Sequence, residues 1–490
     1  MGVVGTSFLI KESIMQFKKT LLATSALMSA MAWAPQAHAI PAFARQVGMP
    51  CSACHYQHFP TLNAFGRSFK ASGFTMVGSE EKIEGDGLSI PAVLNLAFIT
   101  NIQYTKTNGV TAPAGAVAAI PGNAGTAAFT PNTALTKDTN NGQFSMTQYS
   151  LFMGGRVADN IGFEGEVGLS GGAALASVKL PFSYDVGPGK LGIVPFTTDG
   201  LGPQQGFEPL SDGATPVHLF NQQDMAAIGA EEYIMGGSNG GAIPANGAAL
   251  YYYTDQGFVN FTKWQVDSIN GNGPGQAPGA AGGGSPTSNY LRAAWTPGNV
   301  AGFDTAIGFQ AASGTSSTTS SAYTSNYTLA NGFAATSGTY KTRMTEVDGQ
   351  MLGDAGGMPL TLIASFATAP ASAPGATNLN GGMNVYNNGT ATRKSLNFGA
   401  ELGVIPNKAT LQLGLRRADS GVALAGSTNA TDNAVMLGAT YSLALNVRAE
   451  FTYSMYSGGM YGAAAQAAQA AAGTSYVGNR MTAINLWMGF

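Results

Sequence analysis

From residue 91 onward, the sequence alternates apolar residues with small or polar ones in segments of about ten residues. A period of two places successive side chains on opposite faces of a strand. In the clearest hairpin, 396–404 has one wholly apolar face, turns at 406–407 and returns over 411–416. Segments of this kind are typical of strands that cross a membrane within a closed barrel. The pattern therefore predicts an all-β, antiparallel transmembrane barrel.

The connections between the segments also follow a rule. Sixteen strands are predicted, beginning near residues 92, 144, 161, 174, 190, 247, 258, 288, 302, 338, 359, 391, 408, 433, 446 and 479. Short turns follow the even strands, whereas long Gly, Ala, Ser, Thr and Asn loops mostly follow the odd ones, at 106–143, 198–246, 268–287, 313–337, 368–390, 419–432 and 458–478. Only the short link at 170–174 breaks the alternation. Because short turns of such barrels are periplasmic and long loops extracellular, both termini are expected in the periplasm.

The composition agrees with a barrel and excludes other classes of protein. Only 10% of residues are charged, against roughly 25% in soluble domains, so a soluble β-sandwich fits poorly. The net charge of −3 provides no basic face for a nucleic acid. The charged side chains expected to face a wetted lumen are Glu164, Glu166, Lys179, Arg292, Asp304, Glu346, Asp348, Arg393, Arg416, Arg448 and Glu450.

The first residues have the features of a leader for export. Lys18 and Lys19 precede an apolar run over 21–34, and Ala37-His38-Ala39 supplies an A-x-A cleavage site. This order is that of a secretory signal peptide, predicted to cover 1–39. A membrane anchor is the alternative, but the run is shorter than the roughly 20 residues that a spanning helix needs. An exported β-barrel is expected in the outer membrane of a Gram-negative cell, in contact with its lipid.

One short motif, Cys51-Ser52-Ala53-Cys54-His55, carries the chemistry. C-x-x-C-H is the attachment pattern of a c-type haem, in which two thiols hold the porphyrin and the histidine is the proximal iron ligand. A redox pair would need a thioredoxin-like context, and a zinc site would need about four ligands. A plain disulfide remains an open alternative in an oxidising compartment. The motif predicts one covalent haem, held by Cys51, Cys54 and His55.

The distal iron ligand is a separate question. His58 lies one turn beyond His55, on the same side of the ring, and is expected to make a polar contact instead. Met49 is too close to the attachment point. Met76 lies twenty-one residues beyond His55, far enough along the chain for its side chain to approach the opposite face of the haem. It is therefore the tentative distal ligand. His218, another methionine or an open position are the alternatives.

A longer stretch around the motif resembles a known family. The residues that carry the resemblance are Pro41–Gln46, Cys51–His55, Phe59–Lys70 and Gly73-Phe74. They are similar to the fused cytochrome–porin family, outer-membrane monohaem proteins of Fe(II)-oxidising bacteria. The close match covers only about 35 residues, and the barrel agrees in pattern and length rather than in sequence. The resemblance implies oxidation of extracellular Fe(II), with electrons passed to a periplasmic cytochrome c or a small blue copper protein.

These expectations divide the chain into a signal peptide over 1–39, a mostly helical monohaem cytochrome segment over 40–90 and a barrel over 91–490. The 40–90 segment is expected to plug the lumen. Roughly 30 Å of hydrocarbon separates the two sides of the membrane, so a single haem can exchange electrons with both sides only from within the barrel. Five apolar side chains, Phe59, Leu62, Phe65, Phe69 and Phe74, are expected to shield the haem, while Arg67 and Lys70 meet haem propionates or lumen acids. A haem-plugged solute porin, or a conduit with another donor or the reverse direction, is the alternative.

Overall fold

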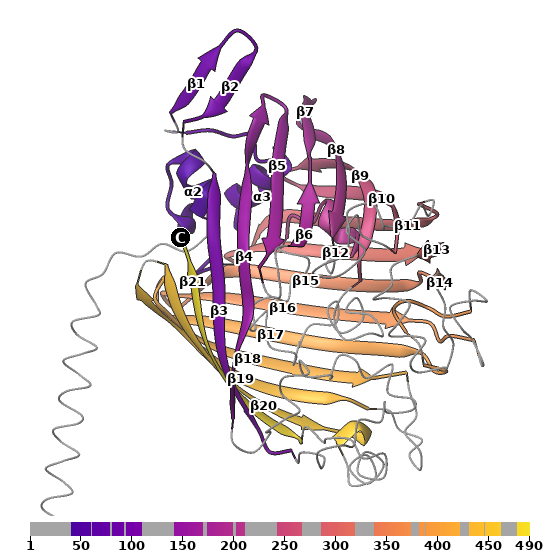
Figure 1. Ribbon diagram of the computed structural model, residues 1–490. Helices are drawn as coiled ribbons and strands as arrows, with labels where there is room; N and C mark the ends of the chain where they lie inside the picture. The colour runs from indigo at the N-terminus through magenta and orange to yellow at the C-terminus, as the bar shows by residue number, and fades with distance from the viewer. Residues whose placement is uncertain are drawn as a thin grey trace, which may run out of the picture.

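Antiparallel strands that close into a barrel make up most of the molecule (Figure 1). The computed structural model describes residues 41–59, 61–78, 81–92, 95–109, 142–169, 174–198, 202–210, 243–266, 286–318, 338–373, 382–387, 389–421, 431–444, 446–461 and 478–490. The barrel elements are β3 (Leu96–Thr107), β4 (Gln143–Ala158), β5 (Ile161–Gly168), β6 (Ala174–Lys179), β7 (Phe182–Val186), β8 (Gly189–Thr198), β9 (Ala245–Thr254), β10 (Gly257–Gln265), β11 (Ser288–Val300), β12 (Phe303–Ser313), β15 (Met344–Ala355), β16 (Met358–Ala369), β17 (Arg393–Ile405), β18 (Ala409–Asp419), β19 (Asn433–Ala444), β20 (Val447–Ser457) and β21 (Arg480–Gly489). The predicted signal peptide lies outside the described residues.

The elements β6 and β7 share one strand position, so the barrel has the sixteen strands that the sequence predicts. Both elements pair with β5 on one side and with β8 on the other. Between them the ladder continues, because the Leu180 amide donates to the Pro195 carbonyl at 3.0 Å and the Gly162 amide donates to the Pro181 carbonyl at 2.9 Å. Pro181 has no amide proton to donate, which interrupts the strand without opening the wall.

The barrel closes where its last strand meets its first. Strand β21 pairs with β3 from Met481 opposite Thr107 to Gly489 opposite Ile99. Beyond that ladder, the backbones of Phe98 and Phe490 exchange hydrogen bonds of 2.8 and 3.0 Å. Closure matters because an unpaired strand edge cannot lie in hydrocarbon.

The outer face of the barrel is apolar, and its interior holds most of the buried polar side chains together with clusters of buried aromatic and apolar ones. In β18, Leu411 and Leu415 are exposed on the outer face, whereas Gln412 and Arg416, which directly follow them, are buried on the inner face. Exposed apolar side chains recur on the outer face of most strands, among them Leu250, Phe261, Ile307, Val347, Leu396, Leu437 and Ile484. This inversion of the soluble pattern is that of a barrel surrounded by lipid. Most of the charges predicted to line the lumen are buried there, namely Lys179, Arg292, Glu346, Asp348, Arg393, Arg416 and Arg448.

The predicted strand positions are confirmed to within a few residues, with the largest difference at β15. That strand begins at Met344 rather than near residue 338, because β13 (Thr315–Thr318) and β14 (Gly338–Lys341) form a separate two-stranded ribbon. One part of a predicted outer loop also lies elsewhere. Residues 202–210 are buried inside the barrel, where Asn260 donates to the Phe207 carbonyl at 2.9 Å. Most of the other long connections lie outside the described residues.

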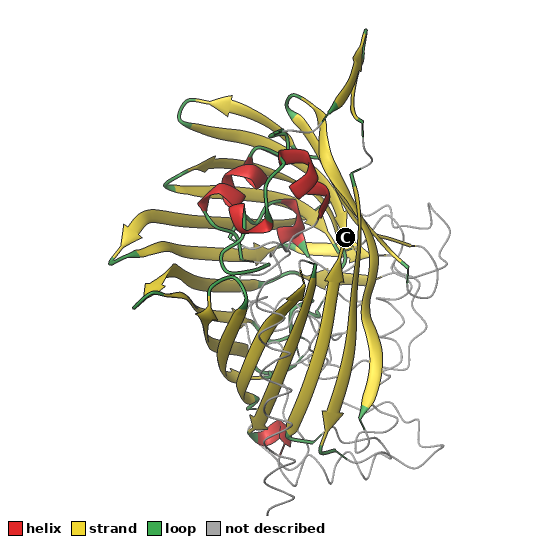
Figure 2. Cartoon of the chain, turned by 90° about the vertical axis from the view of Figure 1, so that its left-hand side faces the viewer, coloured by secondary structure: helices red, strands yellow, loops and turns green. Residues whose placement is uncertain are grey.

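The N-terminal segment lies at the end of the barrel where the short turns are (Figures 1 and 2). It contains α2 (Pro41–Val47), the 3-10 turn η1 (Cys51–Ala53) and α3 (Ala64–Ala71), followed by a hairpin of β1 (Lys82–Gly85) and β2 (Leu88–Pro91) that stands outside the barrel sheet. We refer to residues 41–78 as the plug. No helix among the described residues is long and apolar enough to span a membrane.

Contacts of the plug reach strands around the whole circumference of the barrel. The barrel residues involved are Arg156 in β4, Ser183 in β7, Tyr251 in β9, Asp304 in β12, Gly353 in β15, Thr361 in β16, Glu401 in β17, Arg448 in β20 and Trp487 in β21. Since these strands lie on all sides of the lumen, the plug occupies the lumen at its short-turn end.

The lipid-facing assignment of β19 is testable at Leu437, an outward side chain in mid-strand that is 49% exposed. Leu437→Arg is expected to lower the free energy of unfolding by about 2–4 kcal/mol, because a guanidinium near the bilayer midplane loses its hydration. Urea titration of the protein folded in vesicles measures the change, with Leu437→Val as the control. An arginine variant as stable as the valine variant would contradict the assignment.

Candidate functional site

The candidate site is built on the plug, beginning with the end of α2. Pro41 occupies the first turn of this helix, where its missing amide proton costs nothing. Gly48 ends the helix with φ 67°, a left-handed conformation that glycine adopts without strain, and its amide donates to the Ala44 carbonyl at 2.9 Å. Pro50 then holds an extended conformation directly before Cys51. Because α2 ends at Gly48, the chain turns there and runs back across the face of α2.

The two cysteines and the histidine of the motif share a single helical turn. The amide of His55 donates to the Cys51 carbonyl at 2.9 Å, and the amide of Cys54 donates to the same carbonyl at 3.1 Å. Residues three and four apart lie on one face of such a turn. Cys51 is 7% exposed and His55 6%, while Cys54 is half-buried, and neither cysteine is in a disulfide. The structure thus brings the three predicted attachment residues together.

Asn63 fixes this turn to the start of α3. Its side-chain oxygen caps the helix by accepting from the Gly66 amide at 2.9 Å. Its side-chain nitrogen donates to the Ala53 carbonyl at 2.9 Å, and its own amide donates to the Cys54 carbonyl at 2.9 Å. One side chain therefore both begins the helix and holds the motif against it.

Gly66 allows α3 to pack directly on the motif. A Cβ atom at this position would overlap the carbonyl oxygen of Cys54 and stand 3.0 Å from Cδ2 of Leu62. Only a residue without a side chain permits so close an approach of two backbones. This constraint was not recognised in the sequence, where Gly66 is one glycine among many.

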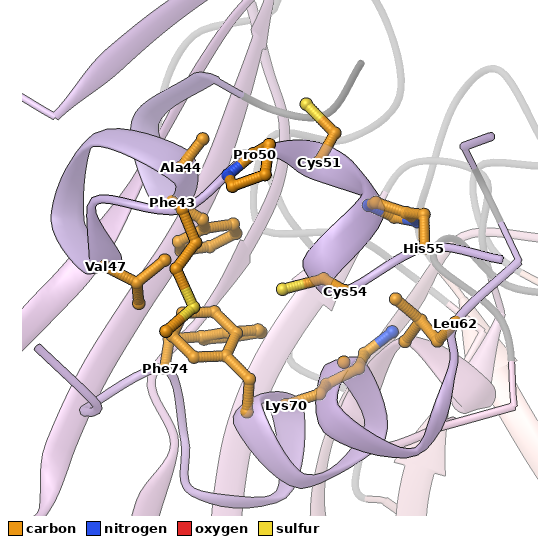
Figure 3. Close-up of a pocket in the computed structure, with 13 residues that line it drawn as sticks. Phe43, Ala44, Val47, Pro50, Cys51, Cys54, His55, Leu62, Lys70 and Phe74 are labelled. Atoms are coloured by element: carbon orange, nitrogen blue, oxygen red, sulfur yellow. The ribbon is translucent and has the colours of Figure 1, made fainter. Parts of the chain in front are cut away.

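Cys51, Cys54 and His55 open onto an apolar pocket with about 500 Å³ of empty space, its mouth included (Figure 3). The other residues that line it are Phe43, Ala44, Val47, Met49, Pro50, Leu62, Gly66, Phe69, Lys70 and Phe74. Lys70 brings a positive charge to a wall that is otherwise largely hydrocarbon. A flat apolar molecule with acidic substituents suits such a pocket, because its body can pack on the aromatic rings and its acids can face the ammonium group.

Aromatic packing holds the pocket wall opposite the motif. Phe43 stacks on Phe74 with ring centroids 4.8 Å apart, and Phe69 meets Phe43 edge-on at 5.4 Å. Gln46 fixes the chain beyond Phe74, because its buried side-chain nitrogen donates to the carbonyls of Phe74 at 2.6 Å and Met76 at 2.7 Å. Phe43 and Val47 were not singled out in the sequence, although both lie in or next to the stretch that carries the family resemblance.

Three of the five predicted shielding residues line the pocket, namely Leu62, Phe69 and Phe74. The other two do not. Phe65 is exposed. Phe59 stacks on Trp487 of β21 with ring centroids 5.9 Å apart and meets the His55 ring edge-on at 5.8 Å. Phe65 therefore belongs to the plug surface, whereas Phe59 packs beside the predicted proximal histidine.

Both cations predicted near the pocket have defined places. Arg67 meets a lumen acid, as expected, in an ion pair of 2.7 Å with Asp304 of β12. Lys70 lines the pocket itself.

Tyr56 also anchors the plug, because its hydroxyl donates to the Gly353 carbonyl of β15. Burial raises the pKa of the Tyr56 phenol, so the donor stays protonated.

His58 makes the polar contact that the sequence predicts. Its Nε2 lies 2.5 Å from a carboxylate oxygen of Glu401 in β17. Its Nδ1 lies 2.5 Å from the carbonyl oxygen of Phe59 and 2.9 Å from Nη1 of Arg448 in β20. Glu401 also accepts from Thr410 at 2.7 Å and Gln412 at 2.9 Å. These contacts join the plug directly to β17 and β20, and Glu401 extends the network to β18.

The tentative distal ligand, Met76, stays a prediction. Its side chain packs beside the cluster of Val47, Phe69 and Phe74 and is absent from the described residues that line the pocket, whereas Met49 is among them. His218 lies outside the described residues. Among those that are described, no group of three or more His, Cys, Asp or Glu side chains is arranged to hold a bare metal ion.

Comparison with known proteins finds similar solved structures but no matching sequence. No protein-family model and no curated protein sequence matches the chain. Among solved structures, OprB of Pseudomonas putida is 12% identical, with a TM-score of 0.48, over 81% of this chain and 93% of that one. OmpT of Vibrio cholerae is 10% identical, with a TM-score of 0.41, over 84% and 100%. An anion-selective porin from Comamonas acidovorans is 10% identical, with a TM-score of 0.40, over 81% and 98%.

The contact between α3 and the motif is testable through the buried thiol of Cys51. Gly66→Ala is expected to cost about 1–3 kcal/mol of local packing and to push α3 away from the motif. An alkylating reagent should then modify Cys51 faster in folded protein whose thiols are unmodified. Ser68→Ala, on the same helix, is the control and should leave the rate unchanged. Equal rates in Gly66→Ala and the parent protein would contradict the contact.

Proposed function

We propose that this protein is an outer-membrane c-type cytochrome that oxidises extracellular Fe(II) and passes the electrons to a periplasmic acceptor. The observation that carries the proposal is the placement of Cys51, Cys54 and His55 on one turn, around an apolar pocket, within a plug that occupies the lumen of a closed barrel. The family resemblance of 41–74 supplies the substrate and the periplasmic cytochrome c or small blue copper protein as partner.

The residues present fit a covalently attached haem. Two thiols and an imidazole at this spacing are the groups that a c-type haem requires, with His55 as the proximal iron ligand. The rings of Phe43, Phe69 and Phe74 supply an apolar wall, and Lys70 supplies a counter-charge for propionates. When bound, the haem supplies a one-electron carrier whose potential depends on its ligands and burial.

The chain's own residues keep this pocket inside the wall of the membrane. A hydrocarbon layer of about 30 Å separates the two aqueous sides, and a carrier held at either surface cannot serve the other. Arg67, His58 and Tyr56 fasten the plug to β12, β17 and β15 respectively, so the pocket cannot drift out of the lumen. With long loops outside and short turns in the periplasm, the plug faces the periplasmic acceptor.

A solute porin with a haem-bearing plug is the second candidate. It is favoured by the closed sixteen-strand barrel and by a lumen lined with polar and charged side chains, such as Gln412 and Arg416. A plug that touches strands on all sides narrows any aqueous path at the short-turn end. Single-channel conductance separates the two candidates, because a solute porin requires an open pore whereas an electron carrier does not.

We expect one covalent haem per chain, reduced on addition of Fe(II). The measurement is the reduced-minus-oxidised absorption spectrum of the purified protein, recorded with Fe(II) and then with dithionite. The double variant Cys51→Ala, Cys54→Ala is expected to lose the covalently attached chromophore, since both thioether links are absent. A chromophore that dithionite reduces but Fe(II) does not would exclude Fe(II) as the donor, and a parent chain without attached haem would exclude the proposal entirely.

A further inference from the structure

The hairpin of β1 and β2 stands outside the barrel sheet at the short-turn end, and none of its residues lines the pocket (Figure 1). Its register sets Ile83 directly opposite Ile90, and Gly85 opposite Leu88. Because side chains alternate between the two faces of a strand, Ile83, Leu88 and Ile90 share one face. They are 52%, 47% and 45% exposed, respectively. The hairpin therefore presents an exposed aliphatic face.

The other face of the hairpin is polar and is fastened to the barrel. It carries Glu84 and Ser89, which lie directly opposite each other. The Ser89 hydroxyl accepts from Nη1 of Arg156 in β4 at 3.4 Å and donates to Glu84 at 3.3 Å. Arg156 also donates to Asp159 in the turn between β4 and β5. Since the polar face contacts β4, the aliphatic face is directed away from that strand.

Exposed charges are distributed unequally between the two ends of the barrel. Every exposed carboxylate among the described residues belongs to the hairpin or lies at a short turn, namely Glu81, Glu84, Asp86, Asp159, Asp185, Asp255 and Asp354. Among the same residues, the exposed lysine and arginine side chains other than Arg45 lie toward the long loops, namely Lys106, Lys263, Arg343, Lys394, Arg417 and Arg480. The short-turn end is therefore acidic, and the hairpin carries three of its carboxylates against the single cation of Lys82.

The hairpin begins beside the mouth of the pocket. The Gly78 amide donates to the Gln46 carbonyl at 3.0 Å, which holds the chain against the end of α2. Glu81, where the hairpin starts, is three residues and therefore at most about 11 Å further along. Met49, just beyond the same end of α2, lines the pocket and is 43% exposed. A protein bound to the hairpin can thus also reach the edge of the pocket.

We propose that the aliphatic face and the carboxylates of this hairpin are the docking surface for the electron acceptor, a small soluble protein with basic side chains around an apolar contact patch. The inference rests on the proposed function, in which the short-turn end faces the periplasm. One electron passes from the pocket to the oxidised acceptor, and no bond forms or breaks. Opposite charges speed the encounter of the two proteins, and the aliphatic contact fixes their orientation.

Two other occupants suit the hairpin less well. In a symmetric contact between two copies of this chain, the carboxylates of one hairpin would meet the same carboxylates of the other, which is unfavourable. In the bilayer, Glu84 and Asp86 would accompany the aliphatic side chains and lose hydration. A basic protein covers the aliphatic face and gains attraction from the same carboxylates.

Binding is measured with the full-length protein, its haem attached, in lipid nanodiscs, and with an oxidised cytochrome c of basic charge as the probe. The triple variant Glu81→Gln, Glu84→Gln, Asp86→Asn is expected to bind the probe at least about tenfold more weakly at low ionic strength and with a flatter salt dependence. The double variant Ile83→Thr, Ile90→Thr is expected to weaken binding about threefold or more while the salt dependence stays the same. Failure of the parent protein to bind the probe at low ionic strength would overturn the inference.

The matched control is the triple variant Asp185→Asn, Asp255→Asn, Asp354→Asn. It changes the net charge by the same amount at other short turns and should bind the probe within about twofold of the parent protein. Equal weakening by both triple variants would overturn the hairpin as the docking surface, because the probe would then respond only to the overall charge of this end. A cytochrome c with succinylated lysines should not bind, and tight binding of it would contradict the charge complementarity.

The occupant of the aliphatic face is followed with a polarity-sensitive dye on Leu88→Cys. We expect emission typical of water at every protein concentration, since the face is open until the acceptor binds. Emission typical of hydrocarbon would assign the face to the bilayer. A change in emission with protein concentration would assign it to a second copy of the chain, and either result overturns the proposal.

Failure of this inference is distinguishable from failure of the proposed function, because binding of the probe is measured without electron transfer. If Fe(II) reduces the parent protein but the hairpin variants bind the probe as tightly as the parent, the docking surface is overturned and the proposed function stands. If Fe(II) does not reduce the parent protein but binding still depends on the hairpin, the proposed function is overturned and the docking surface for a basic protein is supported.

Discussion

Hydrocarbon offers no hydrogen-bond partners, and this one constraint organises the whole molecule. It requires every backbone group of the wall to pair within the sheet, which the chain achieves by closing β21 onto β3 and by carrying the ladder through Leu180 and Pro181. It also drives apolar side chains outward, as Leu411 and Leu415 show, and leaves the lumen as the place for polar chemistry. A polar interior is what allows a separate segment of the chain to be bound there by hydrogen bonds and ion pairs.

The plug is bound in that interior by hydrogen bonds and ion pairs between buried polar groups, in addition to apolar packing. Glu401 illustrates the principle, since the protein satisfies this buried carboxylate with His58, Thr410 and Gln412 together. Removing one of these hydrogen-bond partners would lower the free energy of unfolding by about 1–3 kcal/mol. The plug is therefore part of the barrel's own hydrogen-bonding scheme, and the pocket it carries is fixed relative to both ends of the lumen.

Periodicity was sufficient to predict the barrel, because lipid on one side and water on the other impose a strict alternation at positions such as Leu411 and Gln412. The placement of Cys51, Cys54 and His55 on one helical turn was equally predictable, because C-x-x-C-H fixes their spacing. Contacts between distant segments were not. Nothing local in the sequence shows that Gly66 meets Cys54, that Phe59 stacks on Trp487, or that 202–210 turns into the lumen, since each depends on the tertiary arrangement.

The central claim is that electrons, rather than ions, cross the barrel. Vesicles that contain the protein and enclose oxidised cytochrome c together with a coloured Fe(II) chelator test it most directly when Fe(II) is added outside. The account predicts that the enclosed cytochrome is reduced while the chelator stays uncoloured, and that vesicles with Cys51→Ala, Cys54→Ala protein show neither change. Colouring of the chelator at the rate of cytochrome reduction would contradict the account, because iron itself would then be passing through the lumen.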